Sequence, residues 1–207
     1  MKQFRLLLPL FFLFFSTISF GQSSGSKEGL GLIVKADILL PTIITVENKN
    51  RHNSAANSDK KSFFSITIEK QFKKRQSLQL SGAYYSEDYT HYMDYKIKTN
   101  SITIVPEYKF FVLKNKPITG PYIGSYLLYI NEQVRDVEYV YHIYNYNNTQ
   151  LGGGFSTGYQ FYIKNKIVID ALVGGGLQKV ITGRNVDHQV PYWDMNLRFA
   201  INIGYKF

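Results

Sequence analysis

The chain has 207 residues, and 24 Lys and Arg against 15 Asp and Glu give it a net charge of +9 at pH 7. It has no cysteine, which excludes a disulfide scaffold, a thiolate metal site and a lipoprotein anchor. Beyond the N-terminal segment, no stretch approaches the ~20 continuous apolar residues of a membrane helix. Stability must therefore come from a packed core or from a closed ladder of strands.

The beginning of the chain has the organisation of a secretory signal peptide. Lys2 and Arg5 form a positive region, an apolar run follows, and Gly21 supplies a small residue before a cleavage site at Gln22. A retained membrane anchor is the alternative, but the apolar run is short and ends at small residues. Loss of the two cations lowers the net charge from +9 to +7. In an exported chain this surplus favours anionic lipid headgroups or lipopolysaccharide phosphates over nucleic acid, although a basic surface without a partner explains it equally well.

An alternation of apolar and polar side chains recurs from residue 30 to the C-terminus, and its period of two predicts β-strands. In the last strand every odd position is large and apolar, and the strand exceeds the ~9–11 tilted residues that cross a bilayer. Pro106 lacks an amide hydrogen and predicts a bulge or a gap in the fourth strand. The eight predicted strands span about residues 30–40 (ending near 41–46), 64–72, 78–84, 101–110, 118–131, 151–163, 167–180 and 193–207.

The connections between the predicted strands alternate between short and long. Short turns on the periplasmic side and long loops outside are typical of outer-membrane barrels. Short basic turns are expected at 73–76, 113–117 and 164–166, and polar loops at 48–61, 87–96, 132–148 and 181–191. An outward aromatic residue near the turn end of each descending strand also predicts an inner aromatic girdle. Its members are Phe72, Phe110, Phe161, Tyr205 and Phe207.

Four short motifs fall on the predicted strands: Lys35–Leu40 (KADILL), Val105–Phe110 (VPEYKF), Gly120–Gly124 (GPYIG) and Gly158–Phe161 (GYQF). With them the chain resembles small eight-stranded outer-membrane β-barrels of the OmpA/OmpX architectural type, and barrel families of Gram-negative bacteria that have no assigned chemistry. The resemblance implies an all-β, eight-stranded antiparallel up-and-down transmembrane β-barrel, and it carries over no catalytic or binding residue. The terminal Gly204–Phe207 (GYKF) resembles the signal read by the barrel-assembly machinery, which implies Tyr205 and Phe207 as an assembly signal. The expected parts are a signal peptide at 1–21, a short N-terminal tail at 22–28 and an outer-membrane β-barrel domain at 29–207.

Charged side chains collect on the inward-facing positions of the predicted strands. The lumen of an eight-stranded barrel is just wide enough for side chains to fill it, so opposite charges there should pair. We expect a polar network that plugs the lumen and leaves no open water-filled pore, with an ion or proton path as the alternative. The expected members of this lumen polar network are Lys35, Asp37, Glu69, Glu107, Lys109, Asp170 and Arg198.

Two patterns that occur in enzymes have structural explanations here. Gly154–Gly158 fits the Gly-x-Ser-x-Gly pattern of a hydrolase nucleophile elbow, but that elbow needs a strand-to-helix turn, and here the alternation continues through Ser156. The histidines fall one in each predicted long loop, where they could bind a metal or act as a general base, but without a diagnostic spacing. We assign no catalytic, cofactor-binding or metal-binding residue and expect no cofactor. The histidines are His52, His91, His142 and His188.

The third predicted loop is rich in tyrosine. Alternating tyrosines there would extend the two flanking strands above the membrane as a surface for protein or glycan contact. An outer aromatic girdle is an equally economical explanation. The residues of this possible interaction surface are Tyr139, Tyr141, Tyr144 and Tyr146.

The sequence thus predicts an outer-membrane β-barrel with a structural, adhesion or envelope-complex interaction role. Its expected partners are outer-membrane lipid and lipopolysaccharide, the barrel-assembly machinery during biogenesis, and an envelope protein or glycan, but no nucleic acid. The alternative is an outer-membrane enzyme that acts on lipid A, phospholipid or peptides through extracellular-loop residues. A passive pore would need an open lumen. A soluble lipocalin-like barrel would place its apolar residues inside, and the last strand speaks against it.

Overall fold

The structure, a computed structural model, describes residues 31–37, 42–46, 57–90, 96–113, 118–136, 146–182 and 193–207. The predicted signal peptide, its cleavage site and the N-terminal tail lie outside these residues. Within the described part of the chain, no helix is long and apolar enough to cross a membrane. The strands are β1 (Leu32–Asp37), β2 (Thr42–Val46), β3 (Asn57–Lys73), β4 (Gln76–Thr90), β5 (Lys96–Phe111), β6 (Gly120–Asp136), β7 (Tyr146–Ile163), β8 (Ile167–Thr182) and β9 (Trp193–Lys206).

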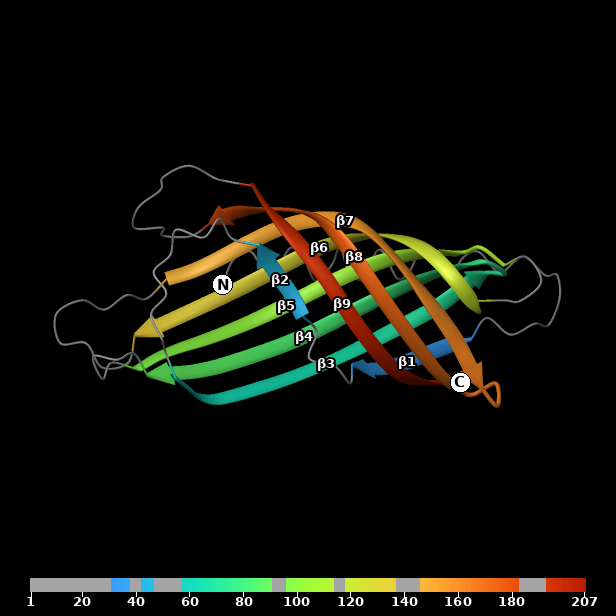
Figure 1. Cartoon of the computed structure of the whole chain (residues 1–207), viewed down its shortest axis with the longest axis horizontal. Helices are drawn as coiled ribbons and strands as arrows, with labels where there is room; N and C mark the ends of the chain where they lie inside the picture. The colour runs from blue at the N-terminus through green and yellow to red at the C-terminus, as the bar shows by residue number, and fades with distance from the viewer. Residues whose placement is uncertain are drawn as a thin grey trace. The chain divides into compact units, whose positions relative to one another are not determined.

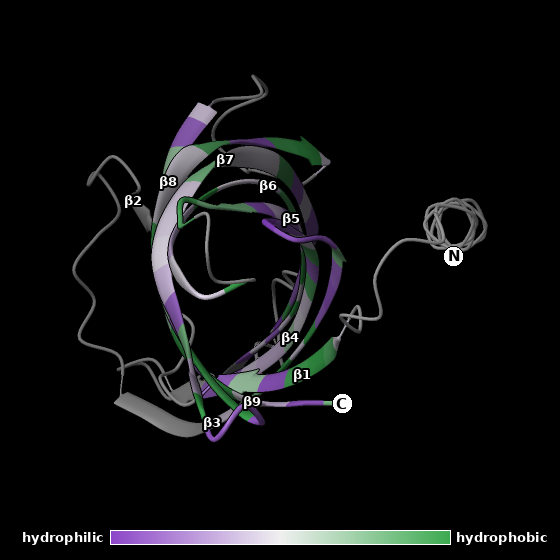
Figure 2. Cartoon of the chain, turned by 90° about the vertical axis from the view of Figure 1, so that its right-hand side faces the viewer, coloured by the Kyte–Doolittle hydropathy of each residue, from purple (hydrophilic) through white to green (hydrophobic). Residues whose placement is uncertain are grey.

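Antiparallel pairing between neighbouring strands closes the sheet into a barrel (Figure 1). Each strand from β3 to β8 pairs with the next one along the chain, and β1 pairs with both β3 and β9. Ala36 of β1, for example, lies opposite Ile66 of β3 and Ile203 of β9. Seen from one end, the strands form a ring (Figure 2). The fold is the predicted all-β, eight-stranded antiparallel up-and-down barrel, in which β1 and β2 share one strand position beside β9.

The division of the first strand into β1 and β2 corrects the prediction of a single uninterrupted strand. Asp37, the last residue of β1, lies opposite Asn202 of β9. Thr42, the first residue of β2, lies opposite Phe199. Five positions along the first strand therefore correspond to only three along β9. Pro41 falls between the two segments in the sequence and has no amide hydrogen to donate to a ladder.

Several strands extend further than the hydropathy pattern predicts. The ladder continues, for example, where Asp88 pairs with Lys98 and where Glu132 pairs with Asn148. Most residues of these extensions are polar, so the period of two disappears from the sequence although the strand pairing persists. The corrected segments, all within predicted loops, are 57–61 of β3, 87–90 of β4, 96 of β5, 132–136 of β6, 146–148 of β7 and 181–182 of β8.

The irregularity expected at Pro106 is present as a gap. On the β4 side Pro106 pairs with Leu80, so that ladder is continuous. On the β6 side the pairing stops after Ile104 and resumes at Glu107, with the same register before and after. The missing amide hydrogen therefore interrupts one ladder without inserting an extra residue, and the alternation of inward and outward side chains is preserved along β5.

The two faces of the barrel wall have opposite polarity. On β9, Arg198 and Asn202 are buried inside the barrel, whereas the outward Phe199 is 42% exposed. Outward aromatic and aliphatic side chains are exposed in the same way on other strands, and Phe155 of β7 reaches 77%. A water-soluble barrel would have its apolar side chains inside and its polar side chains outside, because so many exposed apolar side chains would drive aggregation. The wall is instead built for an apolar surrounding.

Candidate functional site in the barrel lumen

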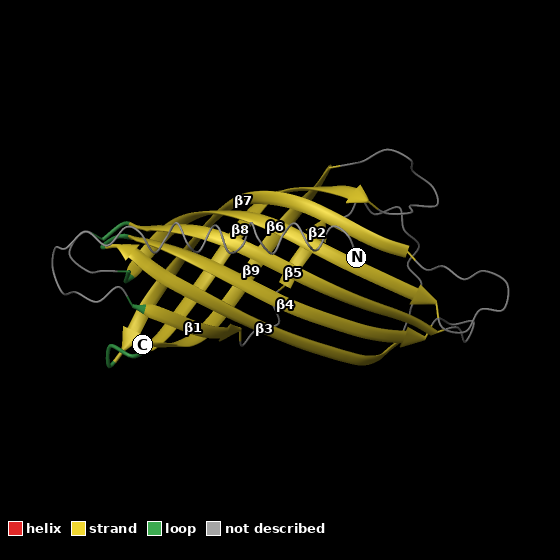
Figure 3. Cartoon of the chain, turned by 180° about the vertical axis from the view of Figure 1, so that it is seen from behind, coloured by secondary structure: helices red, strands yellow, loops and turns green. Residues whose placement is uncertain are grey.

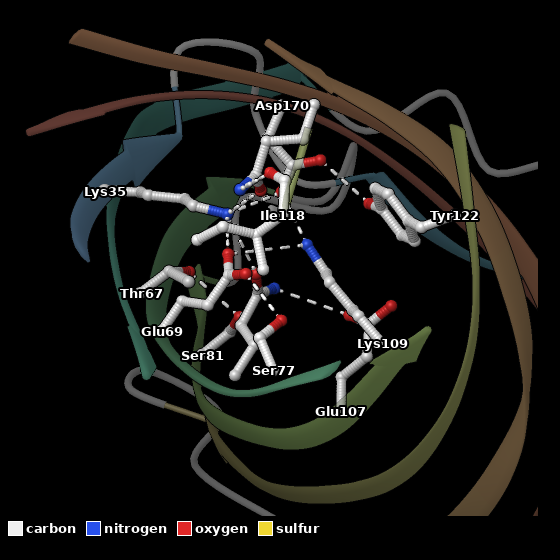
Figure 4. Close-up of polar contacts among 12 residues, drawn as sticks. Lys35, Thr67, Glu69, Ser77, Ser81, Glu107, Lys109, Ile118, Tyr122 and Asp170 are labelled. Atoms are coloured by element: carbon white, nitrogen blue, oxygen red, sulfur yellow. Dashed lines mark hydrogen bonds and ion pairs between the residues drawn. The ribbon is translucent and has the colours of Figure 1, made fainter. Parts of the chain in front are cut away.

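Lys35 is the centre of the polar contacts inside the barrel (Figure 4). It stands on β1, where the alternation of the strand turns it into the lumen, and it is 1% exposed. Its ammonium group forms ion pairs with Glu69 of β3 and with Asp170 of β8, the latter at 2.7 Å. Two glutamine side chains complete its surroundings: Gln160 Oε1 accepts a hydrogen bond at 2.8 Å and Gln79 Oε1 one at 3.2 Å.

A second ammonium group, that of Lys109 on β5, lies against the same carboxylates. Its Nζ is 2.6 Å from Asp170 Oδ2 and 3.9 Å from Glu69 Oε2. The ring of Tyr122 lies 4.3 Å from this cation, and its hydroxyl donates a 2.8 Å hydrogen bond to Asp170 Oδ1. Two buried cations thus face two buried anions. We refer to Lys35, Glu69, Lys109 and Asp170 as the ionic cluster.

A third ion pair adjoins the ionic cluster. Arg198 of β9 lies 2.7 Å from Glu107 of β5, and the other oxygen of Glu107 accepts a 2.5 Å hydrogen bond from Ser156. Gln79 joins the two groups, because its amide donates to Glu107 at 3.4 Å while its oxygen accepts from Lys35. Ser156 is therefore a buried serine in the middle of β7, as its place in the alternation predicts, and not part of a strand-to-helix turn.

The structure brings together six of the seven residues expected in the lumen. Asp37, the seventh, is half-buried and lines a small cavity of about 30 Å³ next to Arg198. Small polar side chains, among them Thr67 and Ser81, also line this cavity. The cavity thus lies directly beside the ion pairs, where the inward side chains become short.

Neutral residues make many of the contacts in the lumen, and none of them is among the seven residues predicted for the polar network. Tyr122 is the clearest case, because the tyrosines of the fifth predicted strand fall on both parities of the alternation, so the pattern does not say which of them face inward. Its inward position depends on Gly158, directly opposite on β7: a Cβ there would lie 2.5 Å from the Tyr122 hydroxyl. A glycine across from an inward tyrosine is a signal that the sequence does contain. The residues missed are Ser77, Gln79, Tyr122, Tyr126, Gln160 and Asn196.

The same close approach explains the position of the central lysine. Lys35 and Gly204 are cross-strand neighbours, and a Cβ on Gly204 would lie 2.6 Å from Lys35 Cγ. The absence of a side chain on β9 at this point gives the aliphatic part of Lys35 room to lie across the wall. Its ammonium group thereby reaches the carboxylates near the middle of the lumen.

The predicted girdle residues lie at the end of the barrel that holds the short turns. Phe161 and Tyr205 are 38% and 42% exposed there, and Tyr205 packs against Phe207 with ring centroids 5.0 Å apart. Phe72 and Phe110 are half-buried on the same side, and the Arg75 guanidinium lies 4.5 Å from the Phe110 ring. The two residues of the expected assembly signal are therefore on the outer surface, at the closing edge of β9.

Most of the loop features fall outside the described residues. This holds for the four histidines and for Tyr139, Tyr141 and Tyr144. Tyr146 is the first residue of β7 and pairs with Val134 of β6. Among the described residues, no group of three His, Cys, Asp or Glu side chains is arranged as metal ligands.

The closed antiparallel barrel, with ion pairs inside and apolar side chains outside, defines the class of small outer-membrane-type β-barrels. The chain is similar in structure to the outer membrane protein AlkL, with a TM-score of 0.51, 8% identity, and coverage of 90% of this chain and 94% of that chain. It also matches Neisserial surface protein A (NspA), with a TM-score of 0.48, 15% identity, and coverage of 85% and 97%. For OprG from Pseudomonas aeruginosa the TM-score is 0.42, the identity 12% and the coverage 86% and 96%.

The sequence itself assigns the family. Residues 38–188 match the family described as Protein of unknown function (DUF3575), and the chain belongs to this family. The match begins after β1 and ends before β9, so it leaves out the two strands that close the barrel. No protein with curated annotation matches the chain.

Proposed function

We propose that the protein is an outer-membrane β-barrel with a structural, adhesion or envelope-complex interaction role, and that its lumen is plugged by polar side chains. The observation that carries this proposal is the ionic cluster. It draws Lys35, Glu69, Lys109 and Asp170 from four different strands into one group of fully buried contacts. A barrel with this interior has a rigid wall and gives solutes no route through the lumen. Its outer surface is then the part available for interaction.

The energetics of the cluster favour a permanent plug. A charge taken out of water is stabilised only by close partners, and removal of one partner from a buried pair typically costs ~3–5 kcal/mol. Water or ions passing through this level of the lumen would have to separate several such pairs at once. The neutral residues add to the barrier, because Tyr122, Gln79 and Gln160 fill the spaces between the charges with further hydrogen bonds.

The exposed apolar wall supports a location in the outer membrane. Strands up to 18 residues long are more than sufficient to cross a bilayer, which takes ~9–11 tilted residues, and their outward residues are aromatic and aliphatic. With the short turns in the periplasm, the extended ends of β6 and β7 would project beyond the membrane. The tyrosine-rich segment between them is the part of the chain we propose for contact with an envelope protein or a glycan.

The experiment that tests this proposal measures conductance. The mature chain is refolded in detergent, and its faster unboiled band on a gel first establishes a closed barrel. The refolded protein is then inserted into planar bilayers. We expect no stable current steps. Reproducible channels of large conductance from the wild-type protein would contradict the plugged lumen and favour the passive pore.

The described residues give no support to the enzyme alternative. A hydrolase acting on lipid A, phospholipid or peptides was expected to use loop histidines, and these lie outside the described residues. A comparison of lipid-A mass spectra from cells with and without the gene tests this alternative directly. We expect identical spectra.

A further inference from the structure

The end of the barrel that holds the short turns is strongly basic. We call this surface the basic turn end. The β3–β4 turn and the β7–β8 turn lie at this end together with the C-terminus (Figure 3). Backbone hydrogen bonds tie its parts together, since Phe111 N donates to Arg75 O and Lys206 N to Lys166 O, both at 2.8 Å. The cationic side chains of the basic turn end are Lys70, Lys73, Lys74, Arg75, Lys164, Lys166 and Lys206.

The acidic side chains in this half of the described barrel are buried in ion pairs inside the lumen. Glu69 and Asp170 are buried in the ionic cluster, and Glu107 is buried against Arg198. Among the described residues of this end, no acidic side chain is exposed. The opposite end differs, because exposed charges of both signs occur there, for example in the Asp88–Lys98 pair at 3.7 Å.

The cations of the basic turn end adjoin exposed apolar residues. Lys164 directly follows Ile163, and Lys166 directly precedes Ile167. Both isoleucines are 41% exposed. Elsewhere on the same end, the Arg75 guanidinium lies 4.5 Å from the ring of Phe110, an outward residue of the predicted girdle. Cations placed at the border of an apolar wall, beside aromatic rings, match an amphiphile that has an anionic head and apolar chains.

We infer that the basic turn end binds the headgroups of anionic phospholipids in the periplasmic leaflet of the membrane. This inference rests on the proposed function, which places the short turns in the periplasm. It differs from the expectation that the positive charge serves lipopolysaccharide, because in the part of the chain that the structure describes the cations without acidic neighbours stand at the turn end and not at the loop end. A soluble polyanion would match the charge but not the apolar residues next to it.

The test compares lipid binding by matched charge variants. The full mature chain, refolded in a neutral detergent, is titrated with phosphatidylglycerol or phosphatidylcholine of the same acyl chains, and bound lipids are counted by native mass spectrometry. In one variant four lysines of the basic turn end are neutralised: K73Q, K74Q, K164Q and K166Q. The control variant loses the same charge at the opposite end: K60Q, K61Q, K98Q and K179Q.

We expect the wild type and the control to prefer phosphatidylglycerol by about tenfold or more, and the turn-end variant to lose most of this preference. The preference should also fall as salt is raised. Equal loss in both variants would overturn the inference. So would binding of soluble polyglutamate, but not of phosphatidylglycerol, through the same lysines. A wild type that shows the heat-dependent gel shift without any lipid preference overturns this inference alone, whereas a wild type without the shift overturns the proposed function as well.

Discussion

The Lys35 ammonium group contacts four side chains in the lumen. Its removal is therefore the most direct test at the scale of one residue. In K35M, Glu69 and Asp170 keep one cation between them instead of two. We expect the free energy of unfolding to fall by ~3–5 kcal/mol, because two buried anions are then left with a single counter-ion. The measurement is urea unfolding in detergent, followed by the heat-dependent gel shift.

The matched control for K35M is K166M, which removes an ammonium group from an exposed turn. A surface change of this kind should alter the free energy of unfolding by less than ~0.5 kcal/mol. If K35M were as mild as K166M, the contacts of Lys35 would contribute little to the barrel.

Gly158 offers a second test at the residue scale. In G158A the new Cβ would lie 2.5 Å from both the Tyr122 hydroxyl and the Ala171 carbonyl oxygen, so the wall or the tyrosine must move. We expect a loss of ~1–3 kcal/mol in the same unfolding measurement. The control is G82A on β4, where a Cβ meets nothing within 4 Å. Comparable losses in the two variants would show that glycine content, and not the approach of Tyr122, decides the effect.

At the scale of the element, the end of β9 joins the closing seam of the barrel. Phe207 N donates a 2.9 Å hydrogen bond to Leu32 O of β1, and its ring packs on Tyr205. Deletion of Phe207 should therefore lower the fraction of folded barrel in cell envelopes several-fold, read as the heat-dependent band in membrane fractions. The substitution F207Y keeps both contacts and serves as the control. Normal yields from the deletion would count against an assembly role of the C-terminus.

The strands differ in how far the sequence predicts them. Where one face contacts an apolar surrounding, as in 193–207, the period of two is complete, and the element and its inward residues follow from it. Where both faces are polar, as in 57–61, the ladder exists without a hydropathy signal. The break between β1 and β2 also has no periodic signature, because it concerns the register on β9 and not the pattern of the segment itself. Only Pro41 hints at it.

The site was predictable in its charges but not in its connections. The alternation of apolar and polar residues alone places Lys35 and Asp170 on the inner face, since successive side chains of every strand in a closed barrel point outward and inward in turn. Which inward residues meet depends on the tilt of strands that are distant in the sequence. Tyr122 was missed for a related reason: its inward position depends on the missing side chain of Gly158, a property of the neighbouring strand.

At the scale of the whole molecule, the ionic cluster determines whether the barrel conducts. A variant without all four charged side chains, K35A/E69A/K109A/D170A, leaves no unpaired ion in the cluster and so differs from K35M. We expect it to fold and to show current steps in planar bilayers, because Lys35 and Lys109, two of the largest fully buried side chains, are shortened together with both carboxylates. If this variant folds and remains silent, the neutral residues close the lumen without help from the ions.

The composition of the ionic cluster also has a consequence for the order of assembly. Lys35, Glu69 and Lys109 are all present once β5 has been made, and together they hold one uncompensated positive charge. Asp170, which neutralises it, lies 135 positions after Lys35, on the penultimate strand. Glu107, also on β5, has the opposite surplus until β9 supplies Arg198. The buried ion pairs are therefore complete only when the last two strands have joined the sheet, so a barrel without these strands would hold unpaired charges in its lumen.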